Sequence, residues 1–128
     1  MTARWKKLVW NIPFNGLSIA AGGIDTATIL SSEPLEYLVR SLMAEIIESA
    51  NQQGYAIPLS LIPEMIERTR TMAGYRPSSL IDFLDGREVE VEAIWGEPVR
   101  RAAAKGITMP RADMLYRQLQ HLTASRKN

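Results

Sequence analysis

Apolar residues recur at helical spacing along most of the chain. The clearest run covers residues 33–53, and its apolar positions are Leu35, Leu38, Val39, Leu42, Met43, Ile46, Ile47 and Ala50. Ser32 can cap this segment, Pro34 suits a first helical turn, and Gly54 follows the end. The pattern predicts a helix that faces the core of the protein.

Three further segments have a similar periodicity. Residues 59–75 (LSLIPEMIERTRTMAGY) can be capped by Ser60, and their apolar face is Leu61, Ile62, Met65, Ile66 and Met72. Residues 92–106 (EAIWGEPVRRAAAKG) run from acidic to basic, the order that a helix dipole favours, with an irregular first half at Gly96 and Pro98. Residues 110–125 predict a last helix, with Met114, Leu115, Leu119 and Leu122 facing inward.

Strand signals are scarce. Residues 87–93 (REVEVEA) alternate with period two, which is typical of a short strand. No second alternating run exists to pair with it, so a turn that leads into the next helix is the preferred interpretation. With the opening segment described below, the sequence predicts an all-α domain of five or six helices that spans residues 1–128.

The opening stretch KLVWNIPFNGLS (7–18) would be apolar on most sides of a helix, yet it carries a polar stripe. Lys7, Asn11 and Asn15 recur every four residues and share one face, which Ser18 extends and which Trp10 and Phe14 flank. Amides on a mostly apolar helix suit the orientation of a ligand, and a lysine there can donate a proton or polarise a carbonyl. A solvated face of an amphipathic helix is the alternative, and spacing alone does not choose between them.

A second candidate block lies in residues 75–98. Ser78 and Ser79 fit a helix cap and first turn, and Glu88, Glu90 and Glu92 fit acids that compensate a helix dipole. The functional alternative is a hydroxyl that binds a substrate carboxylate and a glutamate that partners a lysine. Taken one at a time, each of these residues is more typical of a structural role than of a functional one.

Composition excludes several classes of function. A net charge of +1 gives no electrostatic case for nucleic acid, and without cysteine and with His121 as the one histidine a metal site is not expected. No two glycines have the G-x-G spacing of a dinucleotide site. Asn11 and Pro13 interrupt the first apolar run, so we expect neither a signal peptide nor a membrane span. We therefore expect a cytoplasmic protein.

The two candidate blocks together resemble the C-terminal domain of ketopantoate reductase (2-dehydropantoate 2-reductase). The resemblance rests on KLVWNIPFN, with its K-x-x-x-N-x-x-x-N spacing, and on RPSSLIDFLDGREVEVEAIWG (76–96). RSLMAEIIESA (40–50), EPVRRAAAKGITMP (97–110) and LYRQL (115–119) also fit, so the likeness covers nearly the whole chain. It implies an all-α fold of the kind found in the C-terminal domains of ketopantoate reductase and 6-phosphogluconate dehydrogenase.

The resemblance assigns roles residue by residue. Lys7 looks like the catalytic lysine, which protonates the ketone oxygen as hydride reaches its carbon. Asn11 and Asn15 resemble the asparagines that orient the substrate, and Glu90 resembles the glutamate that contacts the substrate and the lysine region. Ser78 aligns with the substrate-binding serine of the family.

Ser79 stays an alternative to Ser78, because Pro77 stands in place of the first of the usual paired serines. The alignment is anchored on Gly86 and Arg87. Glu92 falls where the family usually has aspartate.

The implied reaction is the NADPH-dependent reduction of 2-dehydropantoate to pantoate, in pantothenate biosynthesis. The Rossmann domain that holds NADPH in the family has no counterpart in this sequence, so the chain is expected to be a fragment or a naturally short protein. NADPH is not expected to bind this chain alone, which we expect to be inactive without a nucleotide-binding partner in trans. The expected partners are a small 2-oxo acid and a second copy of the chain. The alternative is a non-catalytic helical module for dimerisation or partner binding.

Overall fold

The computed structural model describes residues 2–124, and every regular element in this part of the chain is helical. In chain order these elements are α1 (Thr2–Ala20), α2 (Thr26–Ser31), α3 (Glu33–Gln52), α4 (Leu61–Arg70), α5 (Ser78–Leu84), the π-helical turn η1 (Glu92–Gly96), α6 (Glu97–Ala103) and α7 (Pro110–Ala124). The all-α prediction is confirmed, although the short helix α2 was not predicted. Ser125, the end of the last predicted helix, lies outside the described residues.

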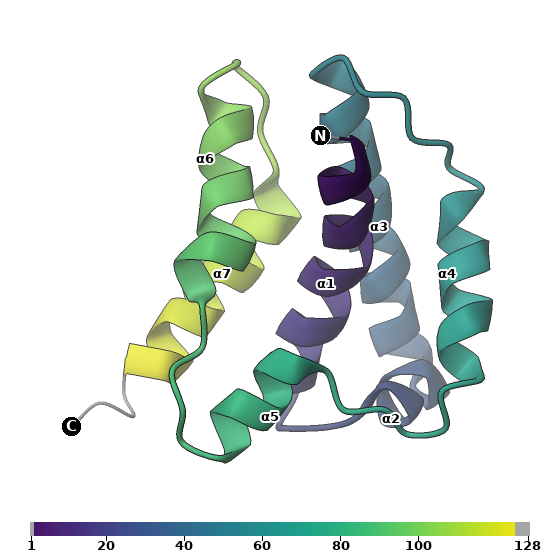
Figure 1. The fold of residues 1–128 in the computed structure, drawn as a ribbon, viewed down its shortest axis with the longest axis vertical. Helices are drawn as coiled ribbons and strands as arrows, with labels where there is room; N and C mark the ends of the chain where they lie inside the picture. Colours follow the sequence, from purple (N-terminus) through teal and green to yellow (C-terminus); the bar gives the residue numbers. More distant parts are fainter. Residues whose placement is uncertain (1, 125–128) are drawn as a thin grey trace.

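The helices α1 and α3 form the centre of the fold. Figure 1 shows α1 in front of α3, with α4 on one side of this pair, α6 and α7 on the other, and α5 at the end where α1 finishes. Val9, Ile12 and Phe14 of α1 and Met43 and Ile46 of α3 are fully buried. Lys7 and Asn11, on the polar face of α1, are not part of this core. No helix within residues 2–124 is long and apolar enough to cross a bilayer.

Local signals at the helix ends are confirmed in part. The hydroxyl of Ser32 accepts a hydrogen bond from the N–H of Leu35 at 3.3 Å, so Ser32 caps α3 as predicted. Ser60 precedes α4, but its side chain makes no capping hydrogen bond, so that prediction is wrong. The backbone of Ser60 already has helical dihedral angles, whereas a capping residue has extended ones.

Two methionines and Leu38, all predicted to face inward, are exposed. Met72 lies beyond the end of α4, so the helical spacing no longer sets its direction. The side chain of Met114 is 66% exposed, because α7 turns Leu115 and Leu119 toward the core instead. A methionine next to a leucine at this spacing fits either face of a helix, and the partner helix decides which is buried.

Residues 87–90 form neither a strand nor a helix, as the preferred interpretation predicted, and Val91 is already helical. Val89 and Val91 are buried, and Glu90 between them is exposed. The N–H of Val91 donates to the carbonyl of Val89 at 2.8 Å, so the period-two pattern reflects a tight turn at Glu90 with both valines on the core. The N–H of Ile94 donates to the carbonyl of Glu90 at 3.2 Å, which joins this segment to η1.

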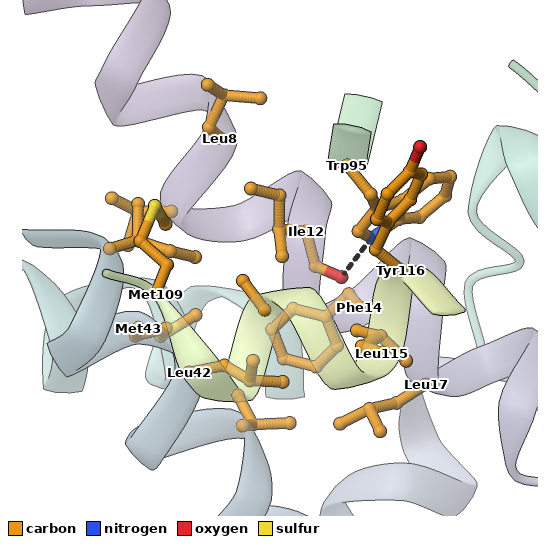
Figure 2. Close-up of a cluster of buried hydrophobic side chains, with 14 of the residues drawn as sticks. Leu8, Ile12, Phe14, Leu17, Leu42, Met43, Trp95, Met109, Leu115 and Tyr116 are labelled. Carbon is orange, nitrogen blue, oxygen red and sulfur yellow. Dashed lines mark hydrogen bonds between the residues drawn. The ribbon is translucent and has the colours of Figure 1, made fainter. Parts of the chain in front are cut away.

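The turn η1 is attached directly to α1. Trp95 is fully buried, and its indole Nε1 donates to the carbonyl of Ile12 at 3.1 Å, as Figure 2 shows. Gly16 makes this close approach possible, because a Cβ at this position would lie 3.0 Å from Trp95 Nε1 and 2.5 Å from Cδ2 of Leu115. The segment that carries Glu90 is thus anchored on the helix that carries Lys7.

Candidate active site

The polar stripe of α1 runs from solvent into the interior. Lys7 is exposed, Asn11 is half-buried, Asn15 is only 3% exposed and Ser18 is fully buried. Within residues 2–124, Lys7 makes no ion pair or hydrogen bond, and neither does the amide of Asn11, so both groups are available to a ligand. The solvated-face alternative does not describe a stripe with a buried end.

Asn15 has a structural contact that the sequence did not reveal. Its Oδ1 accepts a hydrogen bond from the backbone N–H of Ser79 at 3.0 Å. Pro77 precedes α5 and has no side-chain cap, so Asn15 supplies the cap from another helix. Because the donor is a backbone N–H, the facing amide atom must be the oxygen, which leaves the NH₂ group for another acceptor.

The two candidate serines have different environments. Ser79 is buried and fixed through its backbone to Asn15, whereas the side chain of Ser78 is exposed at the first position of α5. An exposed hydroxyl can reach a ligand without any movement of the core. The structure therefore favours Ser78 over Ser79 as the accessible group. Ser78 directly precedes Ser79, the residue whose N–H bonds to Asn15.

Aromatic side chains border the stripe on the side of α4. The rings of Trp10 and Phe14 stack with centroids 4.9 Å apart, and Tyr75 packs against Trp10 at 6.1 Å. Trp10 Nε1 donates to the hydroxyl of Thr69 at 2.8 Å, which fixes the indole ring. Trp10 and Phe14 therefore flank the stripe as the sequence predicted, and Trp10 is held in place by its contacts with Thr69 and Tyr75.

Glu90 lines a cleft that the residues of the stripe do not line. It is one of the residues around an open cleft of about 770 Å³ between residues 86–93 and the last turns of α7, at Gln120 and Thr123. None of Lys7, Asn11, Asn15 and Ser78 lines this cleft. The structure thus brings Asn15 and the serine pair together and places Glu90 apart from them.

A polar cluster next to Glu90 was not predicted. The hydroxyl of Tyr116 donates to Oε1 of Glu92 at 2.5 Å, and Nη1 of Arg100 donates to the same oxygen at 2.8 Å. Nε2 of Gln120 donates to Oε2 of Glu92 at 3.2 Å. The interpretation of Glu92 as a dipole-compensating acid missed this cluster. The four-residue spacing of Tyr116 and Gln120 was the one available signal.

The cluster alters the acidity of its members. The hydrogen bond from Tyr116, followed by that from Arg100, lowers the pKa of Glu92 below its ordinary value. The hydrogen bond to Glu92, followed by burial, raises the pKa of Tyr116. A lowered carboxyl pKa means that the contribution of Glu92 to stability is present above its ordinary pKa and is lost as the pH falls through the lowered value.

We expect Tyr116 to ionise at a higher pH than an ordinary tyrosine, because its pKa is raised. A raised phenol pKa means that its stabilising hydrogen bond is present below pH 10.0 and is lost as the pH rises through the folded-state value. The measurement is a pH titration of the phenolate absorbance, taken as the difference between the wild type and Tyr116→Phe. The midpoint of an ordinary tyrosine lies at about pH 10. A difference curve with its midpoint at or below the ordinary value would contradict the hydrogen bond to Glu92.

The described residues offer little to hold a metal or a dinucleotide. Within residues 2–124, no three acidic or histidine side chains gather as a metal site. The same part of the chain has no strand followed by a glycine-rich loop and a helix, which is the unit that holds a dinucleotide in a Rossmann domain. The groups that the site does hold are a free ammonium, amides and a hydroxyl.

The comparison with protein families decides the relationship. The model of the family "Ketopantoate reductase PanE/ApbA C terminal" matches residues 1–123. The chain belongs to this family. As in the family, its fold is the all-helical C-terminal domain of ketopantoate reductases, and the resemblance seen in the sequence is confirmed.

Individual relatives agree with the family match. A 2-dehydropantoate 2-reductase of Nostoc sp. is 41% identical over 122 residues, which cover 95% of this chain and 38% of that protein. The structure of 2-dehydropantoate 2-reductase from Methylococcus capsulatus matches with a TM-score of 0.91 and 35% identity, over 99% of this chain and 44% of that one. For the enzyme from Geobacter metallireducens GS-15 the TM-score is 0.88 and the identity 43%, over 93% and 40%. This chain therefore spans less than half the length of each.

Proposed function

We propose that residues 1–128 form one helical domain that supplies the substrate-binding and general-acid half of a ketopantoate reductase-like oxidoreductase. The reaction is the NADPH-dependent reduction of 2-dehydropantoate to pantoate, in pantothenate biosynthesis. The observation that carries the proposal is the face of α1, where the free ammonium of Lys7 is followed one and two turns later by the amides of Asn11 and Asn15. The relatives named as 2-dehydropantoate 2-reductases support the choice of substrate.

In this proposal Lys7 is the general acid. Reduction of a ketone places negative charge on its oxygen, and a proton from Nζ of Lys7 converts that oxygen into the hydroxyl of pantoate. Asn11 donates to the substrate from its unengaged amide, and Asn15 donates through the NH₂ group that its bond to Ser79 leaves over. Donors on one rigid helix need no rearrangement as the charge develops.

Ser78 and Glu90 complete the proposed site with different support. Ser78 binds the substrate carboxylate through its exposed hydroxyl, at a helix end fixed by Asn15. For Glu90, the proposed contact with the substrate is supported by the family resemblance alone. Glu90 lines a cleft that the other four residues do not line.

The hydride source lies outside these residues. NADPH supplies the hydride when it is bound, and the described residues have no unit that holds it, so we propose that it binds to a Rossmann domain, in trans or within a longer protein. The chain by itself is then inactive. We further propose a cytoplasmic protein that self-associates through its helical surface. A non-catalytic dimerisation module is a second candidate, favoured by the exposed side chains of Tyr37, Leu59 and Met114.

Ligand-observed NMR tests the proposal with pantoate and NADP⁺ as probes. We expect pantoate to bind the wild type and Lys7→Ala to weaken it by about tenfold or more, the effect of losing one hydrogen bond from a charged donor. Lys6→Ala is the matched control, because Lys6 is an exposed lysine on another side of the same helix. We expect NADP⁺ to bind none of the three proteins.

Two results would contradict the proposal. Equal pantoate binding by the wild type and Lys7→Ala would remove Lys7 from the site. Failure of pantoate to bind the wild type, together with dimers that persist in Lys7→Ala by analytical ultracentrifugation, would favour the non-catalytic module instead.

A further inference from the structure

The cluster around Glu92 connects three helical elements beside Glu90. Glu92 begins η1, Arg100 comes from α6, and Tyr116 and Gln120 come from α7. Gly96 leaves room for it, because a Cβ there would lie 2.7 Å from Oε1 of Glu92 and 2.8 Å from Nη1 of Arg100. A side chain at position 96 would thus displace the members of the cluster.

Tyr116 is the fixed member of this cluster. Its side chain is part of the core, and the residue is only 5% exposed, so the position of its hydroxyl is set by packing. The side chains of Arg100 and Glu92 are 58% and 56% exposed, and exposed ion pairs hold their members weakly. The direction of the Glu92 carboxylate therefore depends on Tyr116 more than on Arg100.

The helix α7, which carries Tyr116, connects the cluster to α1, which carries Lys7. Leu115, next to Tyr116, packs against Gly16 of α1, and Trp95 of η1 bonds to the carbonyl of Ile12. Figure 2 shows Trp95, Tyr116 and Leu115 together against α1. The turn η1 is thus fixed from two sides, by the bond of its own Trp95 indole to the Ile12 carbonyl of α1 and by the Tyr116 phenol of α7.

We propose that Tyr116 is a positioning residue, whose hydroxyl holds Glu92 and thereby fixes Glu90 relative to Lys7 on α1. Glu90 lies two residues before Glu92, and its carbonyl is the acceptor for the N–H of Ile94 within the first turn of η1. A carboxylate anchored at position 92 keeps that turn closed. The functional meaning of a fixed Glu90 rests on the proposed function, but the anchoring does not.

Amide hydrogen exchange measured by NMR tests the anchoring in the full chain. Tyr116→Phe removes the hydroxyl and keeps the ring in the core, and we expect the exchange of the Ile94 amide to accelerate by about tenfold. Amides in the middle of α3, such as that of Ile46, should not change. Arg100→Ala is the comparison, and we expect a smaller acceleration because its side chain is exposed. Unchanged exchange at Ile94, or equal acceleration at Ile94 and Ile46, would overturn the proposal.

Pantoate affinity separates positioning from stability. Tyr116→Phe should weaken pantoate by about tenfold, whereas Ile66→Val, a conservative core change on α4, should leave the affinity unchanged. Equal affinity in the wild type and Tyr116→Phe would overturn the positioning role. Where the wild type binds no pantoate, a faster exchange at Ile94 still supports the anchoring and the failure belongs to the proposed function.

Discussion

Replacing Trp95 by alanine is expected to destabilise the domain by about 4 kcal/mol. The side chain is fully buried between η1 and α1, and its Nε1 donates to the carbonyl of Ile12 at 3.1 Å. The substitution removes the largest side chain of η1, opens a cavity against α1 and deprives the Ile12 carbonyl of that donor. For a domain with a total stability of roughly 5–15 kcal/mol, this loss is a large fraction.

Thermal and denaturant unfolding followed by circular dichroism measure this loss. At about 4 °C for each kcal/mol in a domain of this size, the midpoint should fall by about 15 °C. Trp95→Phe is the control, because it keeps most of the packing and removes the indole N–H. A loss for Trp95→Ala smaller than about 1 kcal/mol, the size of an ordinary surface or conservative change, would mean that η1 is not anchored on α1.

The helices were predictable because their packing follows a local pattern. Residues 33–53 carry a continuous apolar stripe with a serine before it and a glycine after it, and the structure has α3 at Glu33–Gln52. The polar stripe of α1 was equally visible, since a four-residue repeat places side chains on one face of any helix. Residues 26–31 have too few apolar positions to show a period, so α2 was missed.

Contacts between distant segments could not be read in the same way. The cap that Asn15 gives to α5 joins residues 64 positions apart, and neither end has a local signal for it. Met114 and Met72 were assigned to the core by spacing, but the direction of a helix face depends on its neighbours. The cluster of Glu92 with Tyr116 likewise exists only because α7 returns to η1.

The sequence also could not place Glu90 relative to the stripe. The family resemblance assigned Glu90, Lys7 and the two asparagines to one substrate, and the order of residues carries no distances. In the structure Glu90 lines the cleft beside α7, while Lys7 and Asn11 lie on the open face of α1.

The two asparagines of the stripe should differ sharply when each is replaced by alanine. Asn15→Ala leaves the buried N–H of Ser79 without an acceptor at the start of α5, and we expect a loss of about 2 kcal/mol. Asn11→Ala should change the stability by less than about 0.5 kcal/mol, because the residue is half-buried and its amide is unengaged within residues 2–124. Denaturant unfolding of both variants measures the difference.

Pantoate binding by the same variants distinguishes a ligand contact from a structural one. If Asn11 binds the substrate, Asn11→Ala weakens pantoate at unchanged stability, whereas Asn15→Ala weakens it together with the start of α5 and Ser78. Ser79→Ala is the control for the cap, because it removes the hydroxyl but keeps the backbone N–H that Asn15 accepts from. An Asn15→Ala variant as stable as the wild type would refute the cap. Asn15 would then serve the ligand alone, which is the functional interpretation of the stripe.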